Sequence, residues 1–174
     1  MSAQWSVWLL PSAVQLDALT AVVERLAPVF GEPVFVPHAT IQGDVAMDLQ
    51  ALCAAVHDLS KTHAVCRWRV GAIEHSPHFY RCLYLRLQED GGFSSLQRAM
   101  QAATGVADGL SPFPHLSLAY GQMNPQGLAW VQALQDQFVG QDVVLDQLAV
   151  YRSSKQVPIA EWTCVARYPL QAVV

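Results

Sequence analysis

The sequence predicts an α+β fold built from antiparallel sheet and packed helices. Hydrophobic residues make up 52% of the 174 residues and charged residues only 14%, so the chain can bury a core and is not of the disordered class. Apolar residues recur at strand spacing and at helix spacing in turn. Several strand-like segments follow one another across short turns, as antiparallel neighbours do. The length and the absence of a linker-like stretch in the sequence predict a single domain over residues 1–174.

The first predicted elements are a strand and a long helix. Apolar residues over 5–10 predict the strand, which Pro11 ends. The apolar residues that follow recur at helical spacing and predict a helix that begins at Ser12 or Asp17 and ends before Gly31. Serine and aspartate suit the beginning of a helix because their side chains accept hydrogen bonds from unpaired backbone N–H groups.

The middle of the chain predicts three strands and one helix. Residues 34–42 have the composition of a strand, and residues 48–61 carry their apolar side chains on one helical face. Two further strands are expected over 65–74 and 79–88. The turn-prone sequence of residues 75–77 separates them.

The last part of the chain continues the same pattern. A helix over 93–103 precedes a short strand over 116–120. The next helix, over 125–138, has proline in its first turn and glycine past its end, which is the usual asymmetry of helix termini. Two strands over 143–152 and 162–170 complete the prediction.

Charge, hydropathy and cysteine spacing argue against several classes of protein. The net charge of −4 disfavours a protein that grips long nucleic acid, which usually has a basic face. We expect a cytoplasmic protein without a membrane segment, because no apolar run is long enough to span a bilayer and the N-terminus does not resemble a signal peptide. No two cysteines are close enough for a zinc or redox pair, so we expect them to be small buried apolar residues: Cys53, Cys66, Cys82 and Cys164.

Two segments of the sequence are alike, one in each half of the chain. Residues 36–41 are VPHATI and residues 113–118 are FPHLSL, so both have the order apolar, proline, histidine, apolar, hydroxyl, apolar. In a strand, residues two apart point to the same face, so each histidine projects beside its hydroxyl residue while the apolar residues pack behind. One such motif alone would fit a histidine that packs in the core. The pair in matching context favours a shared site.

Two imidazoles and two hydroxyls suit the cleavage of a phosphodiester. In-line displacement at phosphorus needs a base for the nucleophile and an acid for the leaving oxygen, and histidine can be either near neutral pH. Hydroxyl groups can bind the non-bridging oxygens of the phosphate. This chemistry needs no metal, and the sequence has no carboxylate cluster at ligand spacing, so we expect neither a metal nor another cofactor.

The two motifs resemble those of the two-histidine (2H) phosphoesterase superfamily, most closely its plant and yeast type of cyclic phosphodiesterase. Matching segments extend over nearly the whole chain: 6–11, 35–40, 81–85, 114–120, 148–150 and 161–163. The resemblance implies a bilobal fold in which two antiparallel sheets face a central cleft, with helices outside and the two halves related by a pseudo-two-fold axis. It implies hydrolysis of a 2′,3′-cyclic nucleotide or of ADP-ribose 1″,2″-cyclic phosphate to a monoester.

The resemblance also implies roles for individual residues. His38 and His115 are the expected acid–base pair, with the two roles not assigned between them, and Thr40 and Ser117 are the expected phosphate ligands. Trp8, Tyr80 and Tyr120 are further candidates for substrate binding, Trp8 through stacking on a base. A core role fits Trp8 equally well, and rim packing fits Tyr80. Tyr120 follows His115 at an odd spacing, so alternation points it away from the cleft unless the turn at Gly121 redirects it.

Two other functions remain open from the sequence. One is an enzyme that processes RNA ends or resembles the 2′-5′ RNA ligases, which a basic groove would favour. The other is a nucleotide-binding module that does not turn over its ligand. For the main prediction, we expect a monomer whose partner is a small cyclic phosphate.

Overall fold

All seven strands in the described part of the chain join one antiparallel sheet. The computed structural model describes residues 4–172. The strand order is β2-β1-β6-β3-β4-β5, and β7 pairs with β6 beside this path. The strands are β1 (Trp5–Pro11), β2 (Ala39–Val45), β3 (Cys66–His75), β4 (Leu83–Gln88), β5 (His115–Ala119), β6 (Asp142–Arg152) and β7 (Thr163–Pro169).

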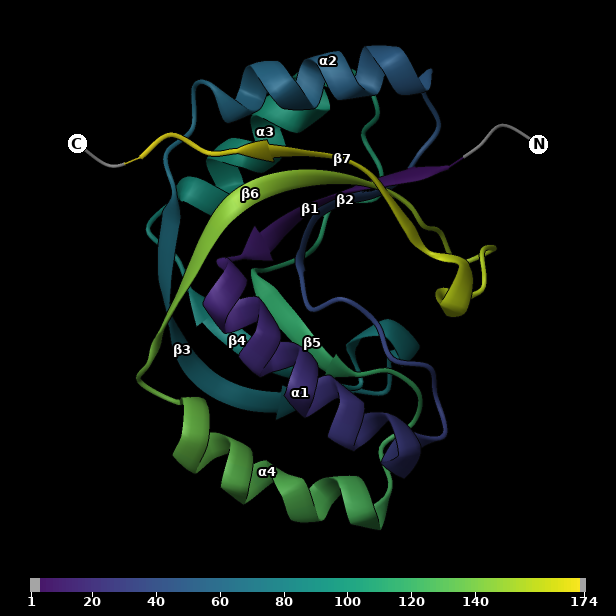
Figure 1. Cartoon of the computed structure of the whole chain (residues 1–174), viewed down its shortest axis with the longest axis vertical. Coiled ribbons are helices and arrows are strands. Elements are labelled where there is room, and N and C mark those ends of the chain that lie inside the picture. Colours follow the sequence, from purple (N-terminus) through teal and green to yellow (C-terminus); the bar gives the residue numbers. More distant parts are fainter. Residues whose placement is uncertain (1–3, 173–174) are drawn as a thin grey trace.

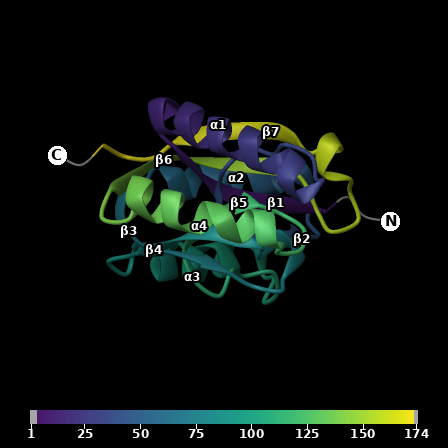
Figure 2. The same cartoon turned by 90° about the horizontal axis from the view of Figure 1, so that it is seen from below.

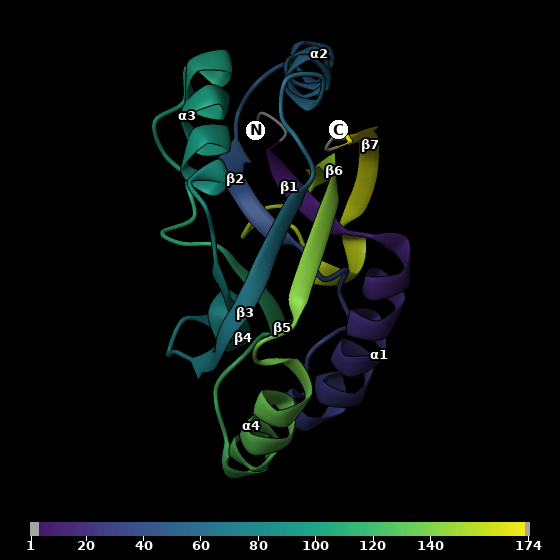
Figure 3. The ribbon, with the colours of Figure 1, turned by 90° about the vertical axis from the view of Figure 1, so that its left-hand side faces the viewer.

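Within residues 4–172, four helices pack against the sheet in two pairs. They are α1 (Ala13–Phe30), α2 (Leu49–Ser60), α3 (Gly92–Thr104) and α4 (Pro125–Phe138). Helices α2 and α3 contact each other and cover β6, β7 and β2 at one end of the molecule, whereas α1 and α4 cover β5 and β3 at the other (Figure 3). Figure 2 shows α1 and α4 next to each other when the molecule is seen from below. The α+β class is therefore confirmed, with the helices on the outside.

The two expected sheets are the two wings of one curled sheet. Strands β2, β1, β6 and β7 form one wing and β3, β4 and β5 form the other. The wings are joined where Cys66–Arg69 of β3 pairs with Asp142–Leu145 of β6. Strong curling of the sheet gives the bilobal shape in Figure 1. The motif strands β2 and β5 stand at the two ends of the strand order, yet they contact each other, because the curl brings the ends together.

Two predicted strands differ from the structure. The segment over 34–42 joins the sheet only from Ala39, because the preceding Pro37 has no N–H to pair with. The segment over 79–88 begins with a 3₁₀ turn at Phe79–Arg81, and β4 starts only at Leu83. Ser76 closes this turn, since its backbone N–H donates to the carbonyl of Cys82. The alternating apolar pattern gave no sign of this interruption.

The core of the protein lies between the sheet and the two pairs of helices. Leu83, Leu85 and Leu87 are buried there on one face of β4. Cys66 and Cys82 are buried as expected, but the expectation is wrong for Cys164, which is exposed on the edge strand β7. No helix within residues 4–172 is long and apolar enough to cross a membrane.

Candidate active site

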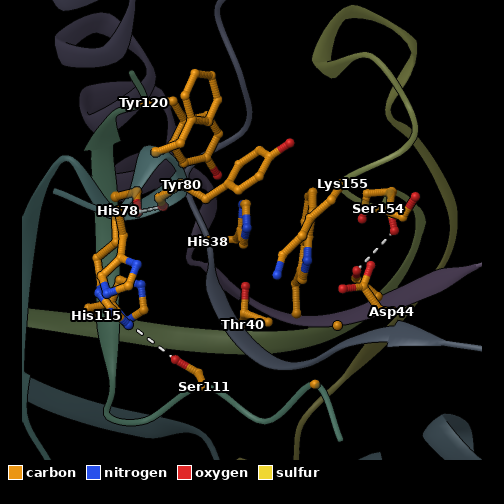
Figure 4. A pocket seen from close by; sticks show the side chains of 18 of the residues that line it. His38, Thr40, Asp44, His78, Tyr80, Ser111, His115, Tyr120, Ser154 and Lys155 are labelled. Atoms are coloured by element: carbon orange, nitrogen blue, oxygen red, sulfur yellow. Dashed lines mark hydrogen bonds between the residues drawn. The ribbon is translucent and has the colours of Figure 1, made fainter. Parts of the chain in front are cut away.

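A cleft of about 520 Å³ lies between the two wings of the sheet. The seven side chains that the sequence singled out all line it: Trp8, His38, Thr40, Tyr80, His115, Ser117 and Tyr120. They come from β1, from β2 and the residue before it, from the 3₁₀ turn before β4, and from β5 and the residue after it. The two motifs, distant in the sequence, thus border one shared space (Figure 4).

The two histidines have the same local geometry. The Nδ1 atom of His38 lies 2.6 Å from the carbonyl oxygen of Val36, and Nδ1 of His115 lies 3.0 Å from that of Phe113. A carbonyl oxygen only accepts hydrogen bonds, so in both rings Nδ1 carries the proton. In each motif a proline stands between the histidine and the carbonyl that orients it. Both imidazoles therefore keep the lone pair on Nε2, the atom that can take up or deliver a proton.

His38 is held in a stack of aromatic rings. Its imidazole lies against the indole of Trp8, with 3.4 Å between ring centroids and 5° between the planes. Tyr151 stacks on the same indole at 3.8 Å, and two rings so close to one centroid must cover opposite faces. This geometry favours support of His38 over the expected stacking of Trp8 on a base. Burial lowers the pKa of His38 to about 3, so its imidazole is neutral at pH 7.

The surroundings of His115 are more polar. The Ser111 hydroxyl donates to the carbonyl of Phe113 at 3.1 Å and lies 3.4 Å from Nδ1 of His115. Arg86 lies over the ring of Phe113, with 3.6 Å between Cζ and the ring centroid. Burial, with smaller effects from the charges of Arg81 and Arg86, lowers the pKa of His115 to about 4. The second imidazole is therefore also neutral at pH 7.

The two hydroxyl residues differ in what they already bind. Ser117 is buried and donates to the carbonyl oxygen of Tyr80 at 2.9 Å. Thr40 is half-buried and its hydroxyl forms no hydrogen bond within the described part of the chain. A hydroxyl has a single proton to donate, so Ser117 must turn away from Tyr80 before it can donate to a ligand, whereas Thr40 is free to do so.

Aromatic rings form one wall of the cleft. Tyr120 is buried, stacks on Phe35 at 3.8 Å and meets Tyr80 and Trp162 edge-on. The alternation of side-chain direction along β5 does not apply to Tyr120, because Tyr120 lies past the last residue of the strand, just before Gly121 with its φ of 110°. Burial raises the pKa of the Tyr120 phenol, so this side chain stays protonated.

The structure adds residues to the cleft that the sequence did not single out. Among those with polar or charged side chains are Ser6, Asp44, His78, Ser111, Ser153, Ser154 and Lys155. Most lie in turns and loops, where no periodicity indicates which way a side chain points. His78 is exposed and lies at the rim of the cleft. Within residues 4–172, no three or more His, Cys, Asp or Glu side chains are grouped so that they could hold a metal ion.

Comparison with known structures supports the same fold. The chain resembles the crystal structure of TT0787 of Thermus thermophilus, with a TM-score of 0.65, 18% identity and coverage of 97% of this chain and 98% of the other. It also resembles E. coli LigT complexed with NADP+, with a TM-score of 0.64, 13% identity and coverage of 98% and 99%. A third likeness is to E. coli LigT complexed with 3′-AMP, with a TM-score of 0.61 and 13% identity over 98% and 99% of the chains.

Comparison of sequences identifies the family. No curated protein sequence matches the chain. A family model described as cyclic phosphodiesterase-like protein, however, matches residues 1–168. With the paired motifs in one cleft and the fold shared with LigT, this match shows that the chain belongs to the cyclic phosphodiesterase-like family of the 2H phosphoesterase superfamily.

Proposed function

We propose that this protein is a metal-independent phosphodiesterase that hydrolyses a small cyclic phosphate to a phosphomonoester. The observation that carries this proposal is the matched pair of imidazoles. Each donates its Nδ1 proton to a carbonyl two residues earlier, and each keeps Nε2 available in the same cleft. His38 and His115 are the proposed acid–base pair. The candidate substrates are a 2′,3′-cyclic nucleotide and ADP-ribose 1″,2″-cyclic phosphate.

The proposed reaction is an in-line displacement at phosphorus. One neutral imidazole takes a proton from water through Nε2 while the water oxygen forms its bond to phosphorus. The other imidazole, protonated, gives its Nε2 proton to the ring oxygen whose bond to phosphorus breaks. Each turnover then consumes one water and yields a monoester. Both pKa values are low in the free protein, so the acid becomes protonated with the help of the negative charge of the bound phosphate, which raises the pKa of a neighbouring imidazole.

Thr40 and Ser117 are the proposed ligands of the non-bridging phosphate oxygens. These oxygens gain negative charge in the transition state, so hydroxyl donors placed in advance stabilise it. Thr40 can donate at once, whereas Ser117 must exchange its bond to the Tyr80 carbonyl for one to the phosphate. Tyr80 and Tyr120 form the wall against which the rest of the substrate is expected to pack.

The size of the cleft supports a small ligand of the nucleotide class. Its volume of about 520 Å³ falls in the usual range of small-molecule sites. Crystal structures of E. coli LigT, which has the same fold, are described as complexes with 3′-AMP, NADP+ and ATP. The net charge of −4 makes a long RNA a less favourable partner.

The test is turnover in the presence of a chelator. Purified protein in EDTA should convert 2′,3′-cyclic nucleotides or ADP-ribose 1″,2″-cyclic phosphate to monoesters. ³¹P NMR measures this conversion. His38→Ala and His115→Ala should each lose several orders of magnitude in kcat. His57→Ala, an exposed position on α2, is the matched control and should keep full activity. Stoichiometric binding without turnover would indicate a binding module instead, and joining of RNA ends without hydrolysis would indicate a ligase.

A further inference from the structure

A polar stripe on α3 faces the loop over 105–114, which leads to the second motif. Gln97, Gln101 and Thr104 lie four and three residues apart, so they share one side of the helix. Nε2 of Gln101 donates to the carbonyl of Ala107 at 3.1 Å, and the Thr104 hydroxyl accepts from the N–H of Val106 at 3.2 Å. The three side chains do not belong to the lining of the cleft, and the reaction proposed above uses none of them.

The amide of Gln97 binds both halves of the site. Its Nε2 atom lies 2.7 Å from the carbonyl oxygen of Ser111 and 3.3 Å from that of Ile41. A carbonyl oxygen only accepts, and Nε2 carries two N–H groups, so the amide donates one proton to each partner. Ile41 directly follows Thr40 of the first motif, and Ser111 contacts His115 of the second. One nitrogen atom therefore holds two backbone positions from different motifs within hydrogen-bond reach of a single point.

Ser111 connects this amide to the second imidazole. The Ser111 hydroxyl donates to the carbonyl of Phe113, which also accepts the Nδ1 proton of His115. The same hydroxyl lies 3.4 Å from Nδ1 of His115 (Figure 4). A shift of the Ser111 backbone therefore changes the contacts both of the imidazole and of the carbonyl that orients it.

The strand of the first motif holds the same loop at a second place. Gln42 of β2 is fully buried, and its Nε2 atom donates to the carbonyls of Val106 and Asp108, both at 2.8 Å. These bonds fix the first part of the loop. The bond from Gln97, in contrast, fixes Ser111, the loop residue that touches the second imidazole.

We infer that Gln97 is a positioning residue, which sets the place of His115 relative to Thr40 by holding Ser111. The inference rests on the proposed function. In-line displacement needs its acid and its base on opposite sides of phosphorus, and a misplacement of about 1 Å can cost about a hundredfold in rate. Strands β2 and β5 stand at the two ends of the strand order, so they do not pair with each other. The Gln97 amide supplies a direct link between the two motifs that strand pairing does not.

The first test is Gln97→Met, which keeps the length of the side chain and removes both donors. The value of kcat should fall about tenfold to a hundredfold, while KM changes much less, because Gln97 does not touch the substrate. Gln101→Met is the matched control: it removes one bond from the same helix to the same loop and should keep full kcat. Denaturation curves of both variants identify a temperature at which both are folded, and kcat is compared there. Wild-type kcat in Gln97→Met, or an equal loss in Gln101→Met, would overturn the inference.

A double-mutant cycle tests the route through Ser111. Ser111→Ala removes the hydroxyl beside His115 and leaves the backbone carbonyl that Gln97 binds. If Gln97 acts through this hydroxyl, Gln97→Met should reduce kcat by a smaller factor in Ser111→Ala than in the wild type. Losses that multiply, as those of independent residues do, would contradict the inference.

A spectroscopic measurement separates this inference from the proposed function. The NMR signals of the His115 ring in the free protein report its surroundings without turnover. Gln97→Met should shift these signals, and Gln101→Met should leave them in place. Unshifted signals and unchanged kcat in an active phosphodiesterase would end the positioning role of Gln97 and leave the proposed function standing. Shifted signals in a protein that hydrolyses neither cyclic phosphate would sustain the positioning role and end the proposed function.

Discussion

The imidazole of His38 lies flat on the indole of Trp8, with 3.4 Å between ring centroids and 5° between the planes. Tyr151 covers the other face of the indole, so neither face of the Trp8 ring is left open for a ligand to stack on. This arrangement fixes the plane of the imidazole while the Val36 carbonyl fixes its rotation. His115 has no such stack and is oriented by its own carbonyl partner and by Ser111.

A first prediction concerns Trp8. Replacement by leucine should lower kcat about tenfold to a hundredfold, because His38 loses the surface that holds its ring in place. Trp8→Phe keeps an aromatic face and should retain much more activity. The loss should be the same for purine and pyrimidine cyclic nucleotides in steady-state kinetics. If Trp8→Leu instead raised KM to an extent that depends on the base of the nucleotide and left kcat unchanged, Trp8 would be a residue that stacks on the base.

A second prediction concerns pH. Burial lowers the pKa of His38 to about 3 and that of His115 to about 4, both from 6.5. Below pH 6.5 the unfolded chain therefore binds more protons than the folded chain, so stability present at pH 7 is lost as the pH falls from about 6.5 towards 4 and then 3. Denaturation at several pH values should show this loss. His38→Gln and His115→Gln should each reduce it.

The same measurement has a direct spectroscopic counterpart. In the free protein, the ring protons of His38 and His115 should not titrate between pH 6 and 7 in an NMR series. Titration of either ring near pH 6.5 would contradict the burial on which the pKa values rest.

A third prediction separates the two hydroxyls. Thr40→Val should lower kcat about tenfold to a thousandfold, as the loss of a donor to developing charge does. Ser117→Ala should cost less than Thr40→Val, because Ser117 first gives up its hydrogen bond to the Tyr80 carbonyl. Thr40→Ser keeps the hydroxyl and is the control. Comparison of kcat among the three variants checks this order, and a Thr40→Val enzyme with full kcat would remove Thr40 from the mechanism.

The quartet of His38, Thr40, His115 and Ser117 could be predicted because its geometry is local. Each histidine takes its orientation from a carbonyl two residues away across a proline, and each hydroxyl lies two residues further on. The same local geometry is present at His38 even though His38 lies just before β2 and not within it. The antiparallel α+β class followed from hydrophobic periodicity for the same reason, since periodicity is a property of short segments.

Other residues of the cleft could not be predicted, because their positions depend on distant pairing. Asp44 reaches the cleft only because the register of β1 and β2 shifts beside it. Tyr80 was expected in the cleft, but on a strand; it lies instead in a 3₁₀ turn, which the sequence pattern did not indicate. Lys155 lies in the loop between β6 and β7, and only the curl of the sheet brings this loop near the two motifs.

A fourth prediction concerns the loop before the second motif. Gly109 has a φ of 80°, and its carbonyl accepts a hydrogen bond from the N–H of Gly43 at 2.7 Å. A Cβ added to Gly109 would collide with the Gly43 carbonyl oxygen, which is backbone and cannot move aside alone. Gly109→Ala should therefore displace the loop, lower the free energy of unfolding by about 2–4 kcal/mol and reduce activity.

Gly105 provides the matched control for this loop. It has a φ of 68°, but an added Cβ would meet nothing within 4 Å. Gly105→Ala should lower the free energy of unfolding only by the strain of a left-handed backbone, about 1–2 kcal/mol, and should leave kcat unchanged. Denaturation curves and kcat of the two variants isolate the effect of the collision. Equal losses of stability and of kcat in the two variants would show that backbone strain alone, and not the collision with Gly43, causes the effect of Gly109→Ala.

A fifth prediction concerns the charge beside His115. The Arg86 guanidinium lies over Phe113, whose carbonyl accepts the Nδ1 proton of His115, and Nη1 of Arg86 is 3.6 Å from Oε2 of Glu74. The positive charges of Arg86 and Arg81 add to burial in lowering the pKa of His115.

Arg86→Gln should raise the pKa of His115 from about 4 towards its ordinary value, because a neutral side chain no longer opposes protonation of the ring. Arg86→Lys keeps the charge and should keep the pKa low. Arg69→Gln removes an exposed arginine that pairs with Asp142 on β6 and should change nothing at His115. NMR titration of the His115 ring measures all three variants. An unchanged pKa in Arg86→Gln would mean that the Arg86 charge does not act on His115, whose low pKa would then come from burial and Arg81.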